Sequence, residues 1–284
     1  MSPSPQAVIR LQGVSKVFPD VPPGTPPALS SLTADVPSGL VVGLVGPDAA
    51  GKTTLMRLLA GLLLPTSGSV EVLGRVPGSE ASDEAVHDVG YMPQRFGLYE
   101  DLSVIDNLNL HAELRGLEGP ARQAMFEKLL TFTALKPFTD RLAGKLSGGM
   151  KRKLMVCRAL LTDPEILLLD EPTAGMDALS RRQMWNLLRK LNEKNLTILL
   201  TTHYMEEAID ADRVIVMDDG KVIMDGIPKE IFSRVKELKE HGLDVPQATE
   251  LAFELKEAGM PLTEGILSRQ ELVEQLTALL SDEK

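Results

Sequence analysis

Residues 46–54 read GPDAAGKTT and fit the phosphate-loop spacing G-x-x-x-x-G-K-[ST]. In such a loop the backbone N–H groups converge on phosphate oxygens, and the start of the following helix favours their negative charge. Lys52 is expected to place its ammonium against the β- and γ-phosphates, and Thr53 to offer its hydroxyl to Mg²⁺. The candidate nucleotide-binding residues of this segment are Gly46, Pro47, Asp48, Ala49, Ala50, Gly51, Lys52, Thr53 and Thr54.

The segments on either side of the loop have the patterns that a nucleotide-binding loop needs. Residues 40–45 (LVVGLV) form an apolar run that is typical of a strand buried on both faces. Residues 52–64 predict a helix that Pro65 ends. A strand, a glycine loop and a helix in this order argue against a chance match of the motif.

Two later strands end in polar side chains. Residues 165–170 (EILLLD) end at Asp170, which Glu171 follows, and residues 196–203 (LTILLTTH) end at His203. In a parallel sheet the carboxyl ends of the strands meet at one edge, where ligands bind. We therefore expect Asp170 to hold Mg²⁺, Glu171 to polarise the attacking water as the catalytic base, and His203 to contact the γ-phosphate.

The segment that narrows the function is LSGGM, residues 146–150. A serine and two glycines can expose a hydroxyl and backbone N–H groups at the start of a helix, which suits a phosphate contact. With the phosphate loop, the two carboxylates and the histidine in this order, the chain resembles the nucleotide-binding subunit of ABC transporters from about Val8 to Gly226. The resemblance implies that Ser147, Gly148 and Gly149 contact the γ-phosphate of an ATP bound to the opposing subunit.

The same resemblance implies roles for three further residues. Gln94 corresponds to the hinge glutamine, which reaches Mg²⁺ and senses the membrane partner. Phe18 corresponds to the aromatic residue that stacks on adenine, although by itself it would be read as a core residue. Residues 174–177 (AGMD) correspond to the segment after the catalytic glutamate that runs along the dimer interface, and Asp177 is its acidic residue. ATP and Mg²⁺ are the implied ligands, and a second ATPase subunit, identical or not, and a transmembrane transporter subunit are the implied partners.

The expected fold is α/β. Alternating strands and helices predict a parallel sheet covered on both faces. The resemblance specifies a P-loop NTPase (RecA-like) parallel-sheet core with an N-terminal antiparallel β subdomain, an inserted α-helical subdomain at about 95–162 and a helical C-terminal tail. We therefore divide the chain into an ATPase domain, 1–228, and a helical extension, 229–284.

The extension predicts three amphipathic helices. Ile231, Phe232, Val235 and Leu238 share one face of the first helix, Pro246 opens the second, and residues 268–271 (SRQE) form a capping box for the third. Two interpretations stay open: the helices pack on their own domain, or they form a dimerisation module.

The resemblance differs along the chain. The part from residue 46 (GPDAAGKTT) to residue 153 (LAGKLSGGMKRK) resembles the ATPases of multidrug and ABC-2-type exporters. The chain from Glu165 and its tail resemble those of energy-coupling-factor transporters. One sequence with both likenesses suggests a hybrid, and an engineered chain is one explanation. Neither the direction of transport nor the transported substrate follows from the sequence.

Two departures from the family pattern leave alternatives to ATP hydrolysis open. Ala49 stands where the family has glycine, and Met150 stands where it has glutamine. Both suggest an alternative to an ATP-hydrolysing subunit, namely a regulatory or assembly module with weak or no turnover. A soluble ABC ATPase of translation or DNA repair is disfavoured, because such proteins have paired cassettes or a long coiled coil.

Composition gives the remaining expectations. The formal net charge of −10 argues against general binding of nucleic acid. Residues 1–10 (MSPSPQAVIR) lack the apolar segment of a signal peptide, and the apolar runs are shorter than the ~20 residues that span a bilayer. We expect a cytoplasmic protein that reaches the inner face of the membrane through partner subunits. Cys157, the single cysteine, is expected to be a buried structural thiol.

Overall fold

The apolar run that precedes the phosphate loop forms a central strand, β3 (Val41–Val45), which is buried along its whole length. The computed structural model describes residues 7–22, 24–78, 88–95 and 97–282. In this part β3 lies between β7 (Thr197–Thr202) and β8 (Arg213–Asp218) in a sheet of order β5-β6-β7-β3-β8-β9, whose other strands are β5 (Val89–Met92), β6 (Ile166–Asp170) and β9 (Lys221–Gly226). Strands β5 to β8 and β3 are parallel, as predicted.

The edge strand β9 is antiparallel because it returns from β8 through a tight hairpin. Asp219 and Gly220 form the turn with φ of 45° and 72°. Positive φ at both turn residues matches the right-handed twist of paired strands, and Gly adopts it without steric cost.

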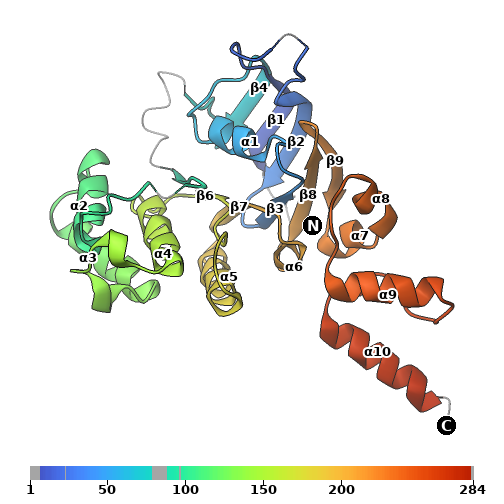
Figure 1. The fold of residues 1–284 in the computed structure, drawn as a ribbon. Coiled ribbons are helices and arrows are strands. Elements are labelled where there is room, and N and C mark those ends of the chain that lie inside the picture. Colours follow the sequence, from blue (N-terminus) through green and yellow to red (C-terminus); the bar gives the residue numbers. More distant parts are fainter. Residues whose placement is uncertain (1–6, 23, 79–87, 96, 283–284) are drawn as a thin grey trace, which may run out of the picture.

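A second, antiparallel sheet has the order β2-β1-β4, with β1 (Ala7–Lys16), β2 (Leu29–Pro37) and β4 (Ser67–Val72). Helix α1 (Lys52–Leu59) lies between the two sheets, since its residues Leu55 and Met56 share one core with Ile9 of β1 and Leu44 of β3 (Figure 1). This packing fixes the start of α1, and therefore the phosphate loop, against both sheets.

Helix α1 is shorter than the sequence predicted. It ends at Leu59, not before Pro65, because Gly61 follows with φ of 70°. The N–H of Leu62 donates to the carbonyl of Arg57, and the N–H of Gly61 donates to that of Leu58. This pair of hydrogen bonds around a left-handed glycine is a Schellman motif, which caps the helix.

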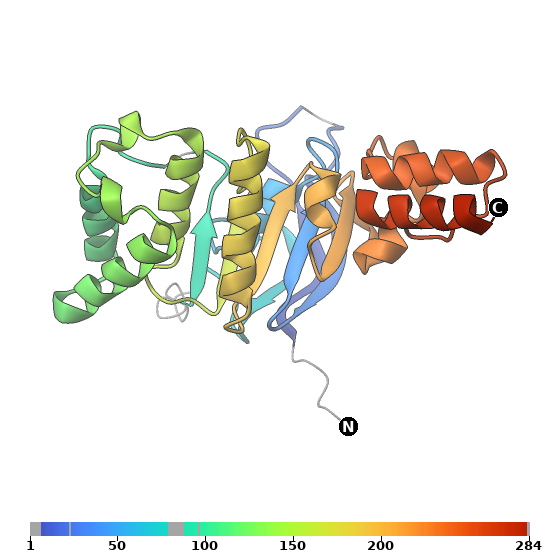
Figure 2. The ribbon, with the colours of Figure 1, turned by 90° about the horizontal axis from the view of Figure 1, so that it is seen from below.

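Helices α2 (Val104–Leu114), α3 (Gly119–Phe132) and α4 (Gly148–Ala159) lie between β5 and β6 in the sequence and form the inserted helical subdomain. Helices α5 (Ala178–Asn192) and α6 (Met205–Ala208) follow β6 and β7. Figures 1 and 2 show the helical subdomain and the C-terminal tail on opposite sides of the sheets. The predicted fold class is therefore confirmed, while the domain bounds stay predictions.

The tail contains α7 (Pro228–Phe232), α8 (Val235–Glu240), α9 (Gln247–Glu257) and α10 (Arg269–Asp282). The single first helix predicted from residues 231–238 is wrong, because the chain breaks after Phe232 and Arg234 has a non-helical φ of −86° and ψ of 52°. The break lets both short helices bury their apolar residues against β8 and β9. The capping box is confirmed: Ser268 Oγ accepts the N–H of Glu271, and Glu271 Oε2 accepts the N–H of Ser268.

Two remaining expectations concern burial. Cys157 is fully buried in the helical subdomain, and burial raises the pKa of its thiol to about 12. It is therefore the structural thiol that the sequence predicts. In the described ranges, the longest apolar stretches of helix fall short of what would be needed to cross a bilayer. The signal-peptide expectation concerns residues 1–10, of which 1–6 lie outside the described residues and the rest begin β1.

Candidate nucleotide site

The predicted phosphate loop, Gly46 to Gly51, connects the end of β3 to the start of α1. Lys52 opens the helix and is buried, and its Nζ donates hydrogen bonds of 2.7 Å to the carbonyl oxygens of Gly46 and Pro47. Burial lowers the pKa of Lys52, while the carboxylates of Asp48, Glu171 and Asp170 act in the opposite direction. The loop thus surrounds a cation that faces the acidic end of β6.

Backbone conformation explains two positions of the loop. Gly51 has φ of 97°, and a Cβ there would lie 2.5 Å from the carbonyl oxygen of Ala28, so only glycine fits. Ala49 has φ of 64°, which is the left-handed region. The alanine that departs from the family pattern therefore carries strain of about 1 kcal/mol. Ala50 is buried and accepts the N–H of Gly220 through its carbonyl, which ties the loop to the β8–β9 turn.

Asp170 ends β6 and is the more buried of the two carboxylates, with 1% of its surface exposed. Its Oδ1 accepts the Thr201 hydroxyl at 2.7 Å, whereas its buried Oδ2 makes no hydrogen bond. Burial raises the pKa of Asp170, and the side chains of Thr201 and Thr53 partly counteract this. The unpaired Oδ2 of Asp170 and the nearby hydroxyl of Thr53 are oxygen donors that fit Mg²⁺, which prefers oxygen ligands.

Glu171 and His203 come together, as predicted, although they lie 32 positions apart in the sequence. The Nδ1 of His203 lies 3.8 Å from Oε1 of Glu171. The N–H of Glu171 donates to the same Thr201 hydroxyl that binds Asp170, at 2.9 Å. Glu171 has φ of 52°, a region that non-glycine residues rarely adopt, and the hydrogen bond from its N–H to Thr201 helps to hold it there.

Gln94 lies two residues after β5, and its side chain is exposed. Its carbonyl oxygen accepts a hydrogen bond of 2.8 Å from the guanidinium of Arg152, a residue of α4 that is only 5% exposed. Burial lowers the pKa of Arg152, and the carboxylates of Glu171 and Asp170 counteract it. This cation therefore connects the Gln94 segment with the helix that follows LSGG and faces the carboxylates. This contact does not follow from the sequence, because a basic residue after the glycines predicts an exposed side chain.

The LSGGM segment forms the start of α4. Ser147 is exposed and caps the helix, with its Oγ accepting the N–H of Met150 at 3.3 Å. Gly148 is exposed and Gly149 half-buried, so the N–H groups at this helix end are open to a ligand. Met150 packs against the core of the helical subdomain, which explains why an apolar residue is tolerated there.

Phe18 and Asp177 lie at the margins of the site. Phe18 follows β1 and is half-buried, with the Lys16 ammonium 5.3 Å from its ring centroid. Asp177 caps α5, since its carboxylate accepts the N–H and the hydroxyl of Ser180 at 2.9 and 2.7 Å. These hydrogen bonds lower the pKa of Asp177. Its contacts within the chain are thus those of a helix cap.

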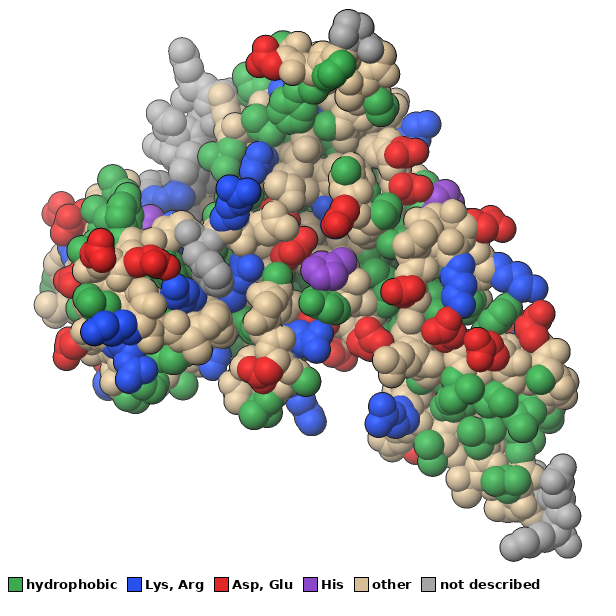
Figure 3. Space-filling view, in the orientation of Figure 1, with side chains coloured by type: hydrophobic (Ala, Val, Ile, Leu, Met, Phe, Trp, Pro, Cys, Tyr) green, Lys and Arg blue, Asp and Glu red, His purple; other side chains and the backbone are tan. Residues whose placement is uncertain are grey.

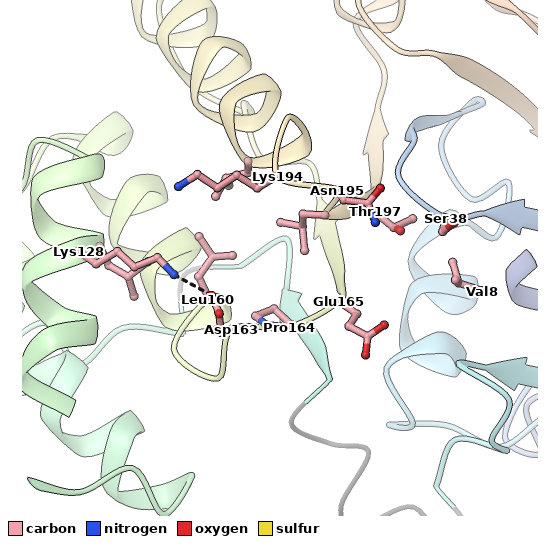
Figure 4. A pocket seen from close by; sticks show the side chains of 13 residues that line it. Val8, Ser38, Lys128, Leu160, Asp163, Pro164, Glu165, Lys194, Asn195 and Thr197 are labelled. Atoms are coloured by element: carbon pink, nitrogen blue, oxygen red, sulfur yellow. Dashed lines mark hydrogen bonds and ion pairs between the residues drawn. The ribbon is translucent and has the colours of Figure 1, made fainter. Parts of the chain in front are cut away.

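A cavity of about 350 Å³ lies at the opposite, amino-terminal end of β6 and β7 (Figure 4). Lys128 and Asp163 form an ion pair of 2.9 Å at one side of it, and Glu165 and Lys194 lie at its rim. It contains none of the predicted site residues, so it is separate from the nucleotide site.

Comparison with known proteins agrees with this geometry. A family model described as "ABC transporter" matches residues 29–174. The chain is also 36% identical to the energy-coupling factor transporter ATP-binding protein EcfA1 of Caldanaerobacter subterraneus, over 94% of this chain and 98% of that relative. The chain belongs to the ABC transporter family. This ABC cassette is 51% identical over 224 residues to the probable multidrug ABC transporter ATP-binding protein YbhF of Escherichia coli, and the match spans 38% of that relative's length.

Solved structures resemble the cassette over most of its length. One is the dimeric ATP-binding cassette MJ0796 in a post-hydrolysis state bound to ADP and Pi, with a TM-score of 0.70 and 26% identity over 78% of this chain and 98% of that one. Another is cbiO1 from Clostridium perfringens, with a TM-score of 0.71 over 86% of this chain and 98% of that one. At 24% identity, the second supports the fold alone.

The alignments also bear on the predicted hybrid. An alignment over 224 residues of a 284-residue chain must extend past Glu165, and one that covers 94% of the chain must begin before it. Both likenesses therefore cross Glu165 and mark no junction there. The wider match, which leaves only 6% of the chain uncovered, also includes most of the tail. A hybrid origin stays a prediction.

Proposed function

We propose that this ABC cassette hydrolyses MgATP as a head-to-tail dimer and thereby powers a separate membrane subunit. The observation that carries the proposal is the convergence of Lys52, Asp170, Glu171 and His203 at the carboxyl ends of three neighbouring strands. A phosphate-binding cation, a metal-binding carboxylate and a base–histidine pair are the groups that phosphoryl transfer to water needs.

Each residue has a distinct part in this proposal. Lys52 and the loop N–H groups bind the β- and γ-phosphates, and the Asp170 carboxylate and Thr53 hydroxyl hold Mg²⁺. The metal, when bound, neutralises charge on the phosphate oxygens. Glu171 accepts the proton of the attacking water, and His203, 3.8 Å away, orients it and contacts the γ-phosphate.

The dimer follows from where the LSGGM segment lies. Its exposed Ser147 is on α4 in the helical subdomain, whereas Lys52 lies at the start of α1 in the core (Figure 1). A second subunit that faces the first would bring its Ser147, Gly148 and Gly149 to the γ-phosphate. The dimeric MJ0796 cassette supports this arrangement by similarity.

The tail supports the same dimer by its surface. Apolar residues of α9, of α10 and of the segment between them stay exposed, and Figure 3 shows apolar side chains gathered over this part of the molecule. They are Leu251, Met260, Val273 and Leu280, at 46, 43, 54 and 69% exposure. Exposed apolar patches of this kind mark interaction sites. We therefore favour a dimerisation module over simple packing on the core.

The membrane subunit is proposed to dock beside Gln94. Tyr99 and Leu114 are large exposed residues of the adjoining helical subdomain, at 55 and 71%. The Arg152 hydrogen bond joins the Gln94 carbonyl to α4, so a force on this segment would reach the helix that contacts ATP. The protein would then be cytoplasmic and peripheral to the membrane.

The test is a measurement of phosphate release and of molar mass for the isolated chain, with and without MgATP. We expect Mg²⁺-dependent turnover and a nucleotide-dependent rise from monomer to dimer mass. The head-to-tail proposal would be contradicted if the chain stayed monomeric in MgATP and still hydrolysed ATP at a rate per subunit that does not depend on protein concentration.

A second function is favoured by the strained Ala49 with φ of 64°. The chain would then bind ATP for assembly or regulation and turn it over slowly or not at all. Nucleotide binding without phosphate release in the same measurements would support it.

A further inference from the structure

A buried carboxylate behind the catalytic residues has no part in the proposed chemistry. Glu207 lies in α6, only 6% exposed. Its Oε2 accepts two hydrogen bonds, from the Thr173 hydroxyl at 2.7 Å and from the Thr202 hydroxyl at 3.1 Å. Thr173 is two residues after Glu171, and Thr202 immediately precedes His203. A single oxygen atom therefore joins the segment that carries the base to the segment that carries the histidine.

The contacts continue on both sides of this carboxylate. The Thr202 hydroxyl also accepts the N–H of Tyr204, so it fixes the backbone around His203. The carbonyl of Thr173 accepts the N–H of Met176, which fixes the turn between Glu171 and the start of α5. The other oxygen, Oε1, lies 4.0 Å from the guanidinium of Arg181 on α5 and makes no hydrogen bond.

Burying the carboxylate of Glu207 costs desolvation free energy, and good packing alone gives no reason to place a charged group there. Burial raises the pKa of Glu207, and the Thr173, Thr202, Arg181 and Trp185 side chains oppose this. Replacing a buried ionic group by a well-packed apolar one is often neutral or stabilising. A carboxylate thus occupies a position where apolar packing would serve stability as well, so we take the geometry fixed by its two hydrogen bonds as the property that it supplies.

We propose that Glu207 is a positioning residue that sets the distance between Glu171 and His203 through the hydroxyls of Thr173 and Thr202. The inference rests on the proposed ATP hydrolysis. Glu171 and His203 act on the attacking water and the γ-phosphate, whereas Lys52 binds phosphate from its own loop on β3 and α1. Loss of Glu207 therefore lowers kcat and leaves ATP affinity unchanged.

The test compares Glu207→Ala, Glu207→Gln, Thr173→Val and Thr202→Val with the parent chain. We expect Glu207→Ala to lower kcat by about 10- to 100-fold, since small displacements of reacting groups have effects of this size. Each valine variant removes one of the two hydrogen bonds and has a smaller effect. Glu207→Gln keeps an oxygen that can accept both hydroxyls and retains most of the parent kcat. The Kd for ATP, from calorimetry, stays within twofold throughout.

The matched control is Glu206→Ala, which removes an exposed carboxylate from the same helix and leaves kcat unchanged. Parent kcat in Glu207→Ala would overturn the proposal. So would a parallel loss of kcat and ATP affinity, because that pattern marks a structural role only. If Glu207→Ala does not fold, the two valine variants decide by the same criteria.

A second readout separates this inference from the proposed function. The imidazole proton resonances of His203 in NMR spectra are expected to shift in Thr202→Val and Glu207→Ala and to stay in place in Glu206→Ala. A parent chain without turnover would contradict ATP hydrolysis, and the His203 resonances would still decide whether Glu207 positions that ring. Unchanged resonances in both variants would overturn the positioning role.

Discussion

The carboxyl-terminal edge of the central sheet and the C-terminal tail differ in which side chains they bury. At the sheet edge, polar groups are buried and paired. The hydroxyl of Thr201 donates to Asp170 and that of Thr202 donates to Glu207, and each of these four residues is at most 6% exposed. In the tail, apolar groups are left outside.

The tail's own core, in its described part, is correspondingly small. The cluster shared by α9 and α10 consists of Ala252, Leu262, Ile266 and Leu272. Buried polar networks specify one geometry, because each group needs its partner. Exposed apolar residues specify contact without fixed geometry. We therefore expect the activity of the site to change when a single hydrogen-bonding atom is removed. We expect the association of the tail to change only when charge is added or apolar area is lost.

The largest expected effect is at the base. Glu171→Gln keeps the shape of the side chain and removes proton acceptance, so kcat should fall by about 100-fold or more. ATP binding should persist, and the variant should accumulate as an ATP-bound dimer. Phosphate release and molar mass in MgATP check this. Parent turnover in the Gln variant would show that Glu171 is not the base.

Thr201→Val tests the polar network with the loss of one hydroxyl. Asp170 Oδ1 and the N–H of Glu171 both lose a partner. We expect the free energy of unfolding to fall by about 2 kcal/mol and kcat by about tenfold or more. Urea unfolding and steady-state kinetics measure these. The matched control is Thr197→Val, at the other end of β7, where only the N–H of Gly39 loses its acceptor. It should lose stability and keep kcat, and an equal loss of kcat in both variants would break the comparison.

Charge tests the tail. Val273 and Leu280 are one face of α10, seven residues apart and exposed. Replacing both with Asp should weaken dimerisation by about tenfold, since apolar contact would be lost, and should change the free energy of unfolding by less than about 0.5 kcal/mol. Sedimentation at several concentrations measures the dimer. Leu114→Asp, which places one such charge on an exposed leucine of α2, is the control. Unchanged dimerisation in the double variant would return the tail to simple packing on its own domain.

The smallest expected effect is at the phosphate loop. Ala49→Gly removes strain of about 1 kcal/mol at a left-handed position, which corresponds to about fivefold tighter ATP binding. Ala50→Gly is the control, because Ala50 lacks the positive φ of its neighbour. Calorimetric titration with MgATP measures both. If Ala49→Gly leaves the Kd unchanged, the alanine fits the loop without strain.

Much of the site follows from local sequence. The spacing of GPDAAGKTT, the two carboxylates after β6 and the histidine after β7 predict one site, because parallel strands bring their carboxyl ends together. The capping box at Ser268 and the turn at Asp219 are equally local, and the structure contains both. The predicted end of α1 was wrong because the glycine at 61, and not the later proline, allows the left-handed turn that stops the helix.

The sequence by itself determined which residues are proposed to carry the chemistry, since each lies at a fixed offset from a strand or helix end. Only the tertiary structure decided what holds them: Thr201 between Asp170 and Glu171, Arg152 on the Gln94 carbonyl, and Glu207 between two threonines. These contacts join residues 30 or more positions apart in the sequence. The exception is the hydrogen bond between Thr202 and Glu207, which are five positions apart. Such partners depend on how strands and helices pack, which no local spacing encodes. The same holds for the tail, where burial of each leucine depends on the helix that faces it.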